Sequence, residues 1–125
     1  MIQNLVQVAL GGAVGASARY LTSVAAMRAF GVGFPWGTIA VNVVGSILMG
    51  ALVVFLAHKE ATHFAPFLMT GVLGGFTTFS AFSLDVMTLF ERGDTGVAAA
   101  YALATVVLSL AAVVAGMAML RGLMT

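Results

Sequence analysis

The sequence predicts an all-α integral membrane protein, and three observations support this prediction. Hydrophobic residues occupy 62% of the 125 positions and charged residues only 7%, compared with about 45–50% apolar and about 25% charged residues in soluble domains. The apolar residues run in four long blocks, and only Arg19 and Asp85 lie well inside them. Each block meets the length of roughly 20 apolar residues that a helix needs to cross a bilayer. We therefore predict a single domain, residues 1–125, of four transmembrane helices.

The four spans are expected at residues 3–27, 37–57, 64–90 and 96–120. The first linker, Arg28 to Trp36, contains glycine and proline, which end helices and favour a tight turn. Trp36 is well placed as an interfacial anchor. The other linkers lie around Lys59 and around Arg92, because charged residues collect where a chain reaches water. No linker is long enough to form a separate domain.

Small residues recur at four-residue spacing inside the spans, which lets helix backbones approach closely in lipid. The pairs are Gly11 with Gly15, Ser46 with Gly50, and Gly71 with Gly75. We assign these pairs to helix packing and not to ligand binding.

The third span is expected to break near its middle. Gly74 and Gly75 precede Thr77 and Thr78 there; glycine weakens a helix, and hydroxyl groups can bond to freed backbone groups. A break at membrane depth is tolerated only inside protein or beside a cavity, where its carbonyl groups can coordinate a cation such as Na⁺. A simple kink is the competing interpretation.

Polar side chains form ribbons along two other spans. They recur every four residues, so each set lies on one helix face. The second span carries Thr38, Asn42 and Ser46, and the fourth carries Tyr101, Thr105 and Ser109. Hydroxyl and amide groups can replace water around a small ion, so the ribbons predict a file of polar stations across the bilayer. Hydrogen bonding between helices is the alternative.

Two phenylalanines follow the predicted break. Phe79 and Phe82 lie three positions apart with Ser80 between them, and the electropositive edges of phenylalanine rings can meet an anion without a fixed charge. A lipid-facing role is the plainer interpretation. Two interpretations are open for the charged residues inside the spans. Arg19 and Asp85 pair with each other, or Arg19 extends toward the membrane interface.

The basic residues give no clear orientation in the membrane. Lys59 and Arg121 fall on the same side as the N-terminus, whereas Arg28 and Arg92 fall on the other. Because basic residues near helix ends normally mark the cytoplasmic side, a chain with two on each side can insert both ways. Two oppositely inserted copies could pair about a twofold axis in the membrane plane. A single, weakly biased orientation is the alternative.

Several other function classes are disfavoured. Five basic and four acidic residues are too few to form a basic surface for nucleic acid. No nucleophile, base and ligand set converges, since His58 and His63 lie in a predicted loop, so we do not expect an enzyme. The strongest alternative is a small dual-topology proton-coupled multidrug exporter. Such a protein should carry an acid in its first helix; here only Asp85, in the third, could serve. A non-transporting assembly subunit is a third possibility.

At these residues the chain resembles the Fluc family of bacterial fluoride channels, also called CrcB. The resemblance covers essentially the whole chain. It rests on a glycine-rich first helix that ends near Ala18-Arg19-Tyr20, on Gly37-Thr38-Ile39-Ala40-Val41-Asn42-Val43-Val44-Gly45-Ser46, and on Gly74 through Phe82. The sequence departs from the family pattern at Asp85, where many relatives would carry glutamate, and at Ala81, where a hydroxyl residue is common.

The resemblance implies an antiparallel, dual-topology homodimer with two fluoride pores in the cell inner (plasma) membrane. The implied role is passive export of fluoride that enters acidified cells as HF, and hence resistance to fluoride toxicity. The residues on the fluoride pathway would include Asn42, Phe79, Phe82, Tyr101, Thr105 and Ser109, with Thr38 and Ser80 added from the polar patterns above. The main-chain carbonyls of Gly74 and Thr77, from both subunits, would hold a structural Na⁺. Arg19 would help to draw anions into the vestibule.

Overall fold

The computed structural model describes all 125 residues and contains helices but no strands. Its elements are α1 (Ile2–Phe30), α2 (Trp36–His58), η1 (Thr62–Phe64), η2 (Pro66–Leu73), α3 (Gly74–Phe76), α4 (Ser80–Glu91) and α5 (Thr95–Met124). Three segments are long and apolar enough to cross a membrane: Trp36–His58, Thr62–Glu91 and Thr95–Met124. The chain is therefore an all-α membrane protein, as the composition predicts.

The first helix differs from these three segments. α1 has 29 residues, but Gln3, Asn4, Gln7 and Arg19 make it less apolar than the others. The helices also run somewhat further than predicted, since α1 ends at Phe30 rather than at residue 27 and α5 continues to Met124 rather than stopping at residue 120.

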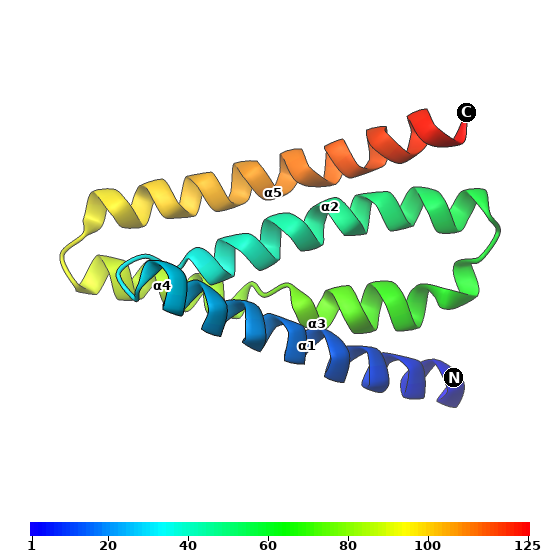
Figure 1. The fold of residues 1–125 in the computed structure, drawn as a ribbon, viewed down its shortest axis with the longest axis horizontal. Helices are drawn as coiled ribbons and strands as arrows, with labels where there is room; N and C mark the ends of the chain where they lie inside the picture. Colours follow the sequence, from blue (N-terminus) through cyan, green and yellow to red (C-terminus); the bar gives the residue numbers. More distant parts are fainter.

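The helices lie side by side in two pairs. α2 packs along α5, and α1 packs along η2 and α3 of the third segment. Both termini lie at one end of the molecule, whereas the α1–α2 and α4–α5 linkers lie at the other (Figure 1). Residues close to either end of the bundle thus come from distant parts of the sequence.

Small residues form the closest contacts in both pairs, as their spacing predicts. A Cβ atom on Gly75 would lie 2.8 Å from the Gly12 carbonyl oxygen, and one on Gly71 would lie 2.9 Å from the Gly11 Cα atom. In the other pair, Gly50 faces the Met117 backbone in the same way. These distances leave no room for a side chain, so the glycines set how closely the backbones approach.

The third segment is irregular in two places. Pro66–Leu73 forms a π-helix, which the sequence pattern did not indicate. α3 then ends at Phe76, and Thr77 is extended, with φ −86° and ψ 159°. A break is thus present, but it lies at residues 77–79, just after the predicted glycine pair. Gly74 and Gly75 stay helical, and Gly75 packs closely against α1.

Little of the chain is buried within the single molecule. Only 16 of 125 residues are buried, and the main apolar cluster joins α4 to α5 through Phe82, Leu89, Ala98 and Tyr101. Many large apolar side chains lie on the outside. Such a surface requires lipid or another protein chain as its neighbour.

Candidate ion pathway

Asn42 holds the break in the third segment. Its Nδ2 atom donates a hydrogen bond to the Thr78 carbonyl oxygen at 3.0 Å, and its Oδ1 atom accepts one from the Thr78 N–H at 2.8 Å. The side chain therefore satisfies both main-chain groups of a residue that lies outside any helix. Asn42 was predicted as a pathway residue, and its observed contacts make it a support for the break as well as part of a cavity wall.

The break leaves three carbonyl groups without hydrogen bonds, those of Gly74, Phe76 and Thr77. Because Asn42 takes the Thr78 N–H, the Gly74 carbonyl lacks its usual helical donor. The N–H of Ala81 goes to the Thr78 hydroxyl group, so the Thr77 carbonyl also accepts no hydrogen bond. Carbonyl oxygens of this kind are suitable ligands for a small cation such as Na⁺.

A cavity of about 290 Å³ lies beside the break. Its walls come from α2, the break, α4 and α5, and are formed by Asn42, Ser46, Thr77, Thr78, Phe79, Phe82, Thr105, Val106, Ser109 and Leu110. No charged side chain lines it. The predicted polar ribbons of the second and fourth spans thus meet here, although Thr38 and Tyr101 do not line this cavity.

Two hydroxyl groups of this cavity have no partner. Thr105 Oγ1 and Ser109 Oγ are buried and make no hydrogen bond. A buried polar group without a partner costs roughly 1–3 kcal/mol, and such groups in a native structure usually serve a ligand or a water molecule. Each hydroxyl can donate a hydrogen bond to an anion.

Aromatic rings continue from the break toward α5. The ring centroids of Phe79 and Phe82 are 5.5 Å apart, and those of Phe82 and Tyr101 are 5.4 Å apart. Tyr101 is completely buried, whereas 76% of the surface of Phe79 is exposed. Phe79 thus borders the cavity on the side that the single chain leaves open.

The two charges inside the spans do not pair. Tyr101 donates a hydrogen bond from its hydroxyl group to Asp85 Oδ2 at 3.0 Å, and Arg19 Nε donates to the Gly75 carbonyl oxygen at 3.0 Å. The chain's one salt bridge joins Arg92 to Asp94. Of the two alternatives left open for Arg19, pairing with Asp85 is therefore wrong, since Arg19 bonds to α3 instead.

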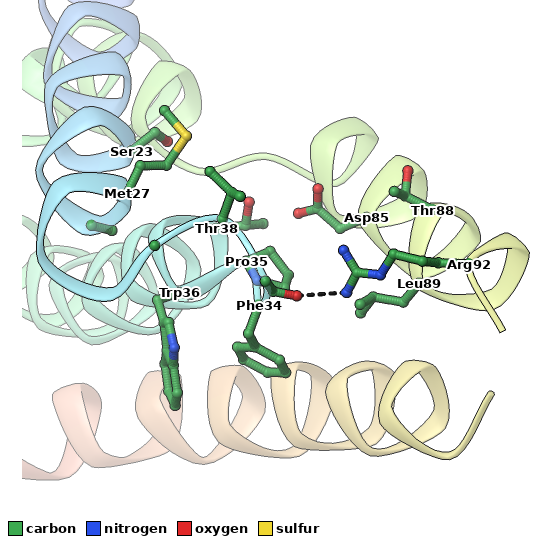
Figure 2. A pocket seen from close by; sticks show the side chains of 14 residues that line it. Ser23, Met27, Phe34, Pro35, Trp36, Thr38, Asp85, Thr88, Leu89 and Arg92 are labelled. Carbon is green, nitrogen blue, oxygen red and sulfur yellow. Dashed lines mark hydrogen bonds between the residues drawn. The ribbon is translucent and has the colours of Figure 1, made fainter. Parts of the chain in front are cut away.

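A second cavity, of about 260 Å³, lies at the end of the bundle that holds the α1–α2 linker. Thr38 and Asp85 line it, together with Ser23, Arg92 and residues of the linker. Figure 2 shows Asp85 of α4 and Arg92, which directly follows α4, projecting into it opposite Thr38. Tyr101 links the two cavities, because its ring contacts Phe82 in the first and its hydroxyl group bonds to Asp85 in the second.

The structure separates the predicted pathway residues into groups. Five line the first cavity: Asn42, Phe79, Phe82, Thr105 and Ser109. Thr38 lines the second cavity, and Tyr101 lies between the two. Ser80 lines neither; it is exposed, and its hydroxyl oxygen lies 3.3 Å from that of Thr78.

Two residues near the second cavity were not predicted from the sequence. Phe34 packs edge-on against the Tyr101 ring, with centroids 5.4 Å apart and planes at 89°. Arg92 donates a hydrogen bond to the Gly33 carbonyl oxygen at 2.6 Å (Figure 2). The aromatic residues on both sides of Pro35 were the available signal, but they were interpreted only as an interfacial anchor at Trp36.

The fold and this cavity define a class: a small helical membrane protein with an uncharged cavity, lined by hydroxyl groups, an amide and aromatic rings, beside a helix break. The family follows from the sequence comparisons. Residues 6–117 match the family described as "CrcB-like protein, Camphor Resistance (CrcB)", and the chain belongs to this family.

Full-length relatives are similar to this chain. The "Fluoride-specific ion channel FluC" of Cereibacter sphaeroides (strain ATCC 17029 / ATH 2.4.9) is 68% identical over 124 residues, which cover 99% of both chains. The relative of the same name from Ruegeria sp. (strain TM1040) is 58% identical over 126 residues and 100% of both chains. That of Paracoccus denitrificans (strain Pd 1222) is 56% identical over 123 residues and 98% of both.

Proposed function

We propose that this chain is a fluoride-selective ion channel, and not an enzyme, that exports fluoride passively and so gives resistance to fluoride toxicity. Relatives that match it along its whole length bear the name of fluoride-specific ion channels. One structural observation carries the proposal: an uncharged cavity contains two buried hydroxyl groups without partners and borders two phenylalanine rings.

This cavity suits a small anion. The Thr105 and Ser109 hydroxyl groups replace hydration water by donating hydrogen bonds to the ion, as lining groups do in selectivity filters. The ring edges of Phe79 and Phe82 add a weak positive potential. Because no acidic side chain lines the cavity, no fixed charge repels the anion, and because no basic one does, none traps it. Thr38, Ser80 and Tyr101 complete the proposed pathway.

We further propose that α1 is a fourth membrane span. It has 29 residues, and at about 1.5 Å per residue it exceeds the roughly 30 Å of the bilayer core. It lies along the third segment, and both termini lie at the same end (Figure 1), which requires an even number of passes. The protein is then a multi-pass protein of the cell inner (plasma) membrane.

The exposed break supports an antiparallel homodimer. Phe79 of the break is exposed in the single chain, as are Gly74 and Ser80 in the helices on either side of it. Irregular backbone, however, does not face lipid in the hydrocarbon region. A second copy of the chain, inserted in the opposite direction, would cover this surface. The even distribution of basic residues permits both orientations. Each dimer would contain two pores, one beside each break.

The carbonyl groups of Gly74 and Thr77 fit a structural Na⁺ at the dimer centre. Both carbonyls lack hydrogen bonds, and Gly74, in the helix just before the break, is exposed. Contributed by both subunits, they would supply four oxygen ligands. When bound, the ion would neutralise these carbonyl dipoles and link the two breaks.

Arg19 remains the candidate for drawing anions toward the vestibule. Its Nε atom donates a hydrogen bond to the Gly75 carbonyl oxygen, but its two terminal nitrogens make no hydrogen bond within the chain. The guanidinium group therefore keeps donors and a full positive charge for an approaching anion.

Fluoride efflux from liposomes tests the proposal. Purified protein is reconstituted in vesicles loaded with potassium fluoride, valinomycin is added, and an ion-selective electrode follows the released fluoride. Rapid fluoride release with negligible release from chloride-loaded vesicles is the expected result. Efflux that instead requires a proton gradient and is lost in Asp85→Asn would favour the proton-coupled exporter. No release from folded, inserted protein would favour an assembly subunit.

A further inference from the structure

The α1–α2 linker contributes an aromatic side chain to the interior of the bundle. The chain turns at Gly31, whose φ of 81° suits glycine, and then places Phe34 against the α4–α5 cluster. The Phe34 ring meets Tyr101 edge-on, with centroids 5.4 Å apart, and lies 4.7 Å from Trp36. A loop residue thus forms part of the surroundings of a buried pathway residue.

The linker is fastened at this position by Arg92. Its Nη2 atom donates to the Gly33 carbonyl oxygen at 2.6 Å, while Nε donates to Asp94 Oδ2 at 3.0 Å. Arg92 follows directly on α4, so this bond ties the linker to the end of that helix (Figure 2). Because Asp94 pairs with the guanidinium group, Arg92 acts here as a tether more than as a free charge.

Tyr101 is held from three directions. Phe82 packs against its ring at 5.4 Å, Phe34 packs against it edge-on, and Asp85 accepts its hydroxyl hydrogen bond. Phe82 and Asp85 both lie on α4, whereas Phe34 is the one aromatic contact that comes from the linker. Without Phe34 the ring has free space on the linker side, and its hydroxyl group can leave the position between the two cavities.

We propose that Phe34 is a positioning residue of the ion pathway, which fixes the Tyr101 hydroxyl group between the two cavities, and that the Arg92–Gly33 hydrogen bond holds Phe34 in place. This inference rests on the proposed function, because it takes Tyr101 as part of the fluoride pathway. It assigns the linker a role in conduction beyond the connection of two helices.

The first test measures fluoride efflux per folded dimer in Phe34→Leu, which keeps apolar volume but removes the ring edge. We expect the rate to fall about fivefold, in line with the loss of one aromatic contact, and Phe34→Tyr to conduct like the unaltered protein. In a Tyr101→Phe background, which lacks the hydroxyl group to be positioned, Phe34→Leu should have almost no further effect. An unchanged rate in Phe34→Leu, or the same reduction in both backgrounds, would overturn the proposal.

The second test uses the chain's single tryptophan, Trp36, as a reporter of the linker. Arg92→Ala should increase acrylamide quenching of Trp36 fluorescence and lower fluoride efflux, and Arg92→Lys, which retains a donor, should lie between. Arg121→Ala, near the C-terminus and far from the linker, is the matched control and should change neither measurement. Arg92→Ala with unaltered quenching and efflux would refute the tether.

The two proposals fail in different ways. If the unaltered protein releases no fluoride, the proposed function is wrong, and Trp36 quenching still reports whether Arg92 fastens the linker. If the unaltered protein releases fluoride and the Phe34→Leu and Arg92→Ala proteins do so equally fast, only the inference about the linker is wrong.

Discussion

Asn42 and Thr78 are 36 positions apart, and the Asn42 amide pairs with both main-chain polar groups of Thr78 as a neighbouring backbone would. This pairing replaces helical hydrogen bonds that the break gives up. It also uses the Thr78 N–H that would otherwise bond to the Gly74 carbonyl in a continuous helix. The geometry of the break therefore depends on one side chain from α2.

Asn42→Ala should destabilise the protein and abolish fluoride efflux. Two hydrogen bonds are lost and the Thr78 N–H remains unsatisfied, which together cost roughly 2–4 kcal/mol. Denaturant titration of the reconstituted or detergent-solubilised protein measures the loss. Asn4→Ala, at an exposed position near the start of α1, is the control and should behave like the unaltered protein. Equal stability of the two variants would contradict the role assigned to Asn42.

Thr105→Val should reduce fluoride efflux without reducing stability. The substitution keeps the shape of the side chain but removes a buried hydroxyl group that has no partner in the chain, so folding loses no hydrogen bond. An ion that uses this donor would face a barrier higher by about 1 kcal/mol, or roughly a fivefold slower flux. Thr70→Val, on the exposed side of η2, should leave the flux unchanged. A slower flux accompanied by lower stability would instead indicate a structural hydroxyl.

The two phenylalanines should respond differently to substitution. Phe79→Leu should slow fluoride efflux while leaving the fold of each chain intact, because this ring is 76% exposed. Phe82→Ala should slow efflux and also cost roughly 3–5 kcal/mol of stability, since Phe82 belongs to the buried cluster. Efflux and denaturant titration distinguish the two effects. Unimpaired fluoride efflux in Phe79→Leu would support the lipid-facing interpretation of this residue.

Gly75→Ala should weaken the packing of α1 against α3. The added methyl group would lie 2.8 Å from the Gly12 carbonyl oxygen, and relieving such an overlap typically costs about 1–3 kcal/mol. Gly12→Ala is a close control, because a Cβ atom at Gly12 meets nothing within 4 Å. It should be neutral or slightly stabilising, as alanine favours a helix more than glycine does. Thermal unfolding in detergent compares them, and equal melting temperatures would argue against close helix packing.

Removal of Na⁺ should lower the stability of the proposed dimer. If Gly74 and Thr77 carbonyls bind the ion only in the folded dimer, Na⁺ at about 100 times its Kd stabilises by roughly 2.7 kcal/mol. Replacement of Na⁺ by N-methyl-D-glucamine should therefore lower the melting temperature, and added Na⁺ should restore it. Identical melting curves in the two salts would exclude a structural Na⁺ that binds tightly enough to stabilise the folded protein.

Much of the fold could be predicted from local patterns. The four apolar blocks predicted the helical segments, and glycine spacing predicted the contacts of Gly71 and Gly75 with α1. The break was expected at Gly74 and Gly75 but lies at residues 77–79. Local propensity identified the region of the break correctly. The pairing between Asn42 and Thr78 determined at which residue the helix breaks.

The candidate site could be predicted only in part. The four-residue spacing of Thr105 and Ser109 placed both on one face, and the structure places that face on the cavity with Asn42. The same spacing grouped Thr38 with Asn42, but Thr38 lies on the second cavity. A polar ribbon along a helix is longer than one cavity, so spacing alone does not show which of its members meet.

The sequence by itself determined that this chain is an all-α membrane protein, because composition and apolar block length follow directly from the solvent that surrounds the helices. The tertiary structure alone decided the partners of the polar groups: Arg19 with Gly75, Asp85 with Tyr101, and Arg92 with Gly33. The physical reason is that residue periodicity specifies the faces of a helix. Which faces meet, and at what height, depends on where the backbones approach most closely, and glycine packing between distant segments sets that approach.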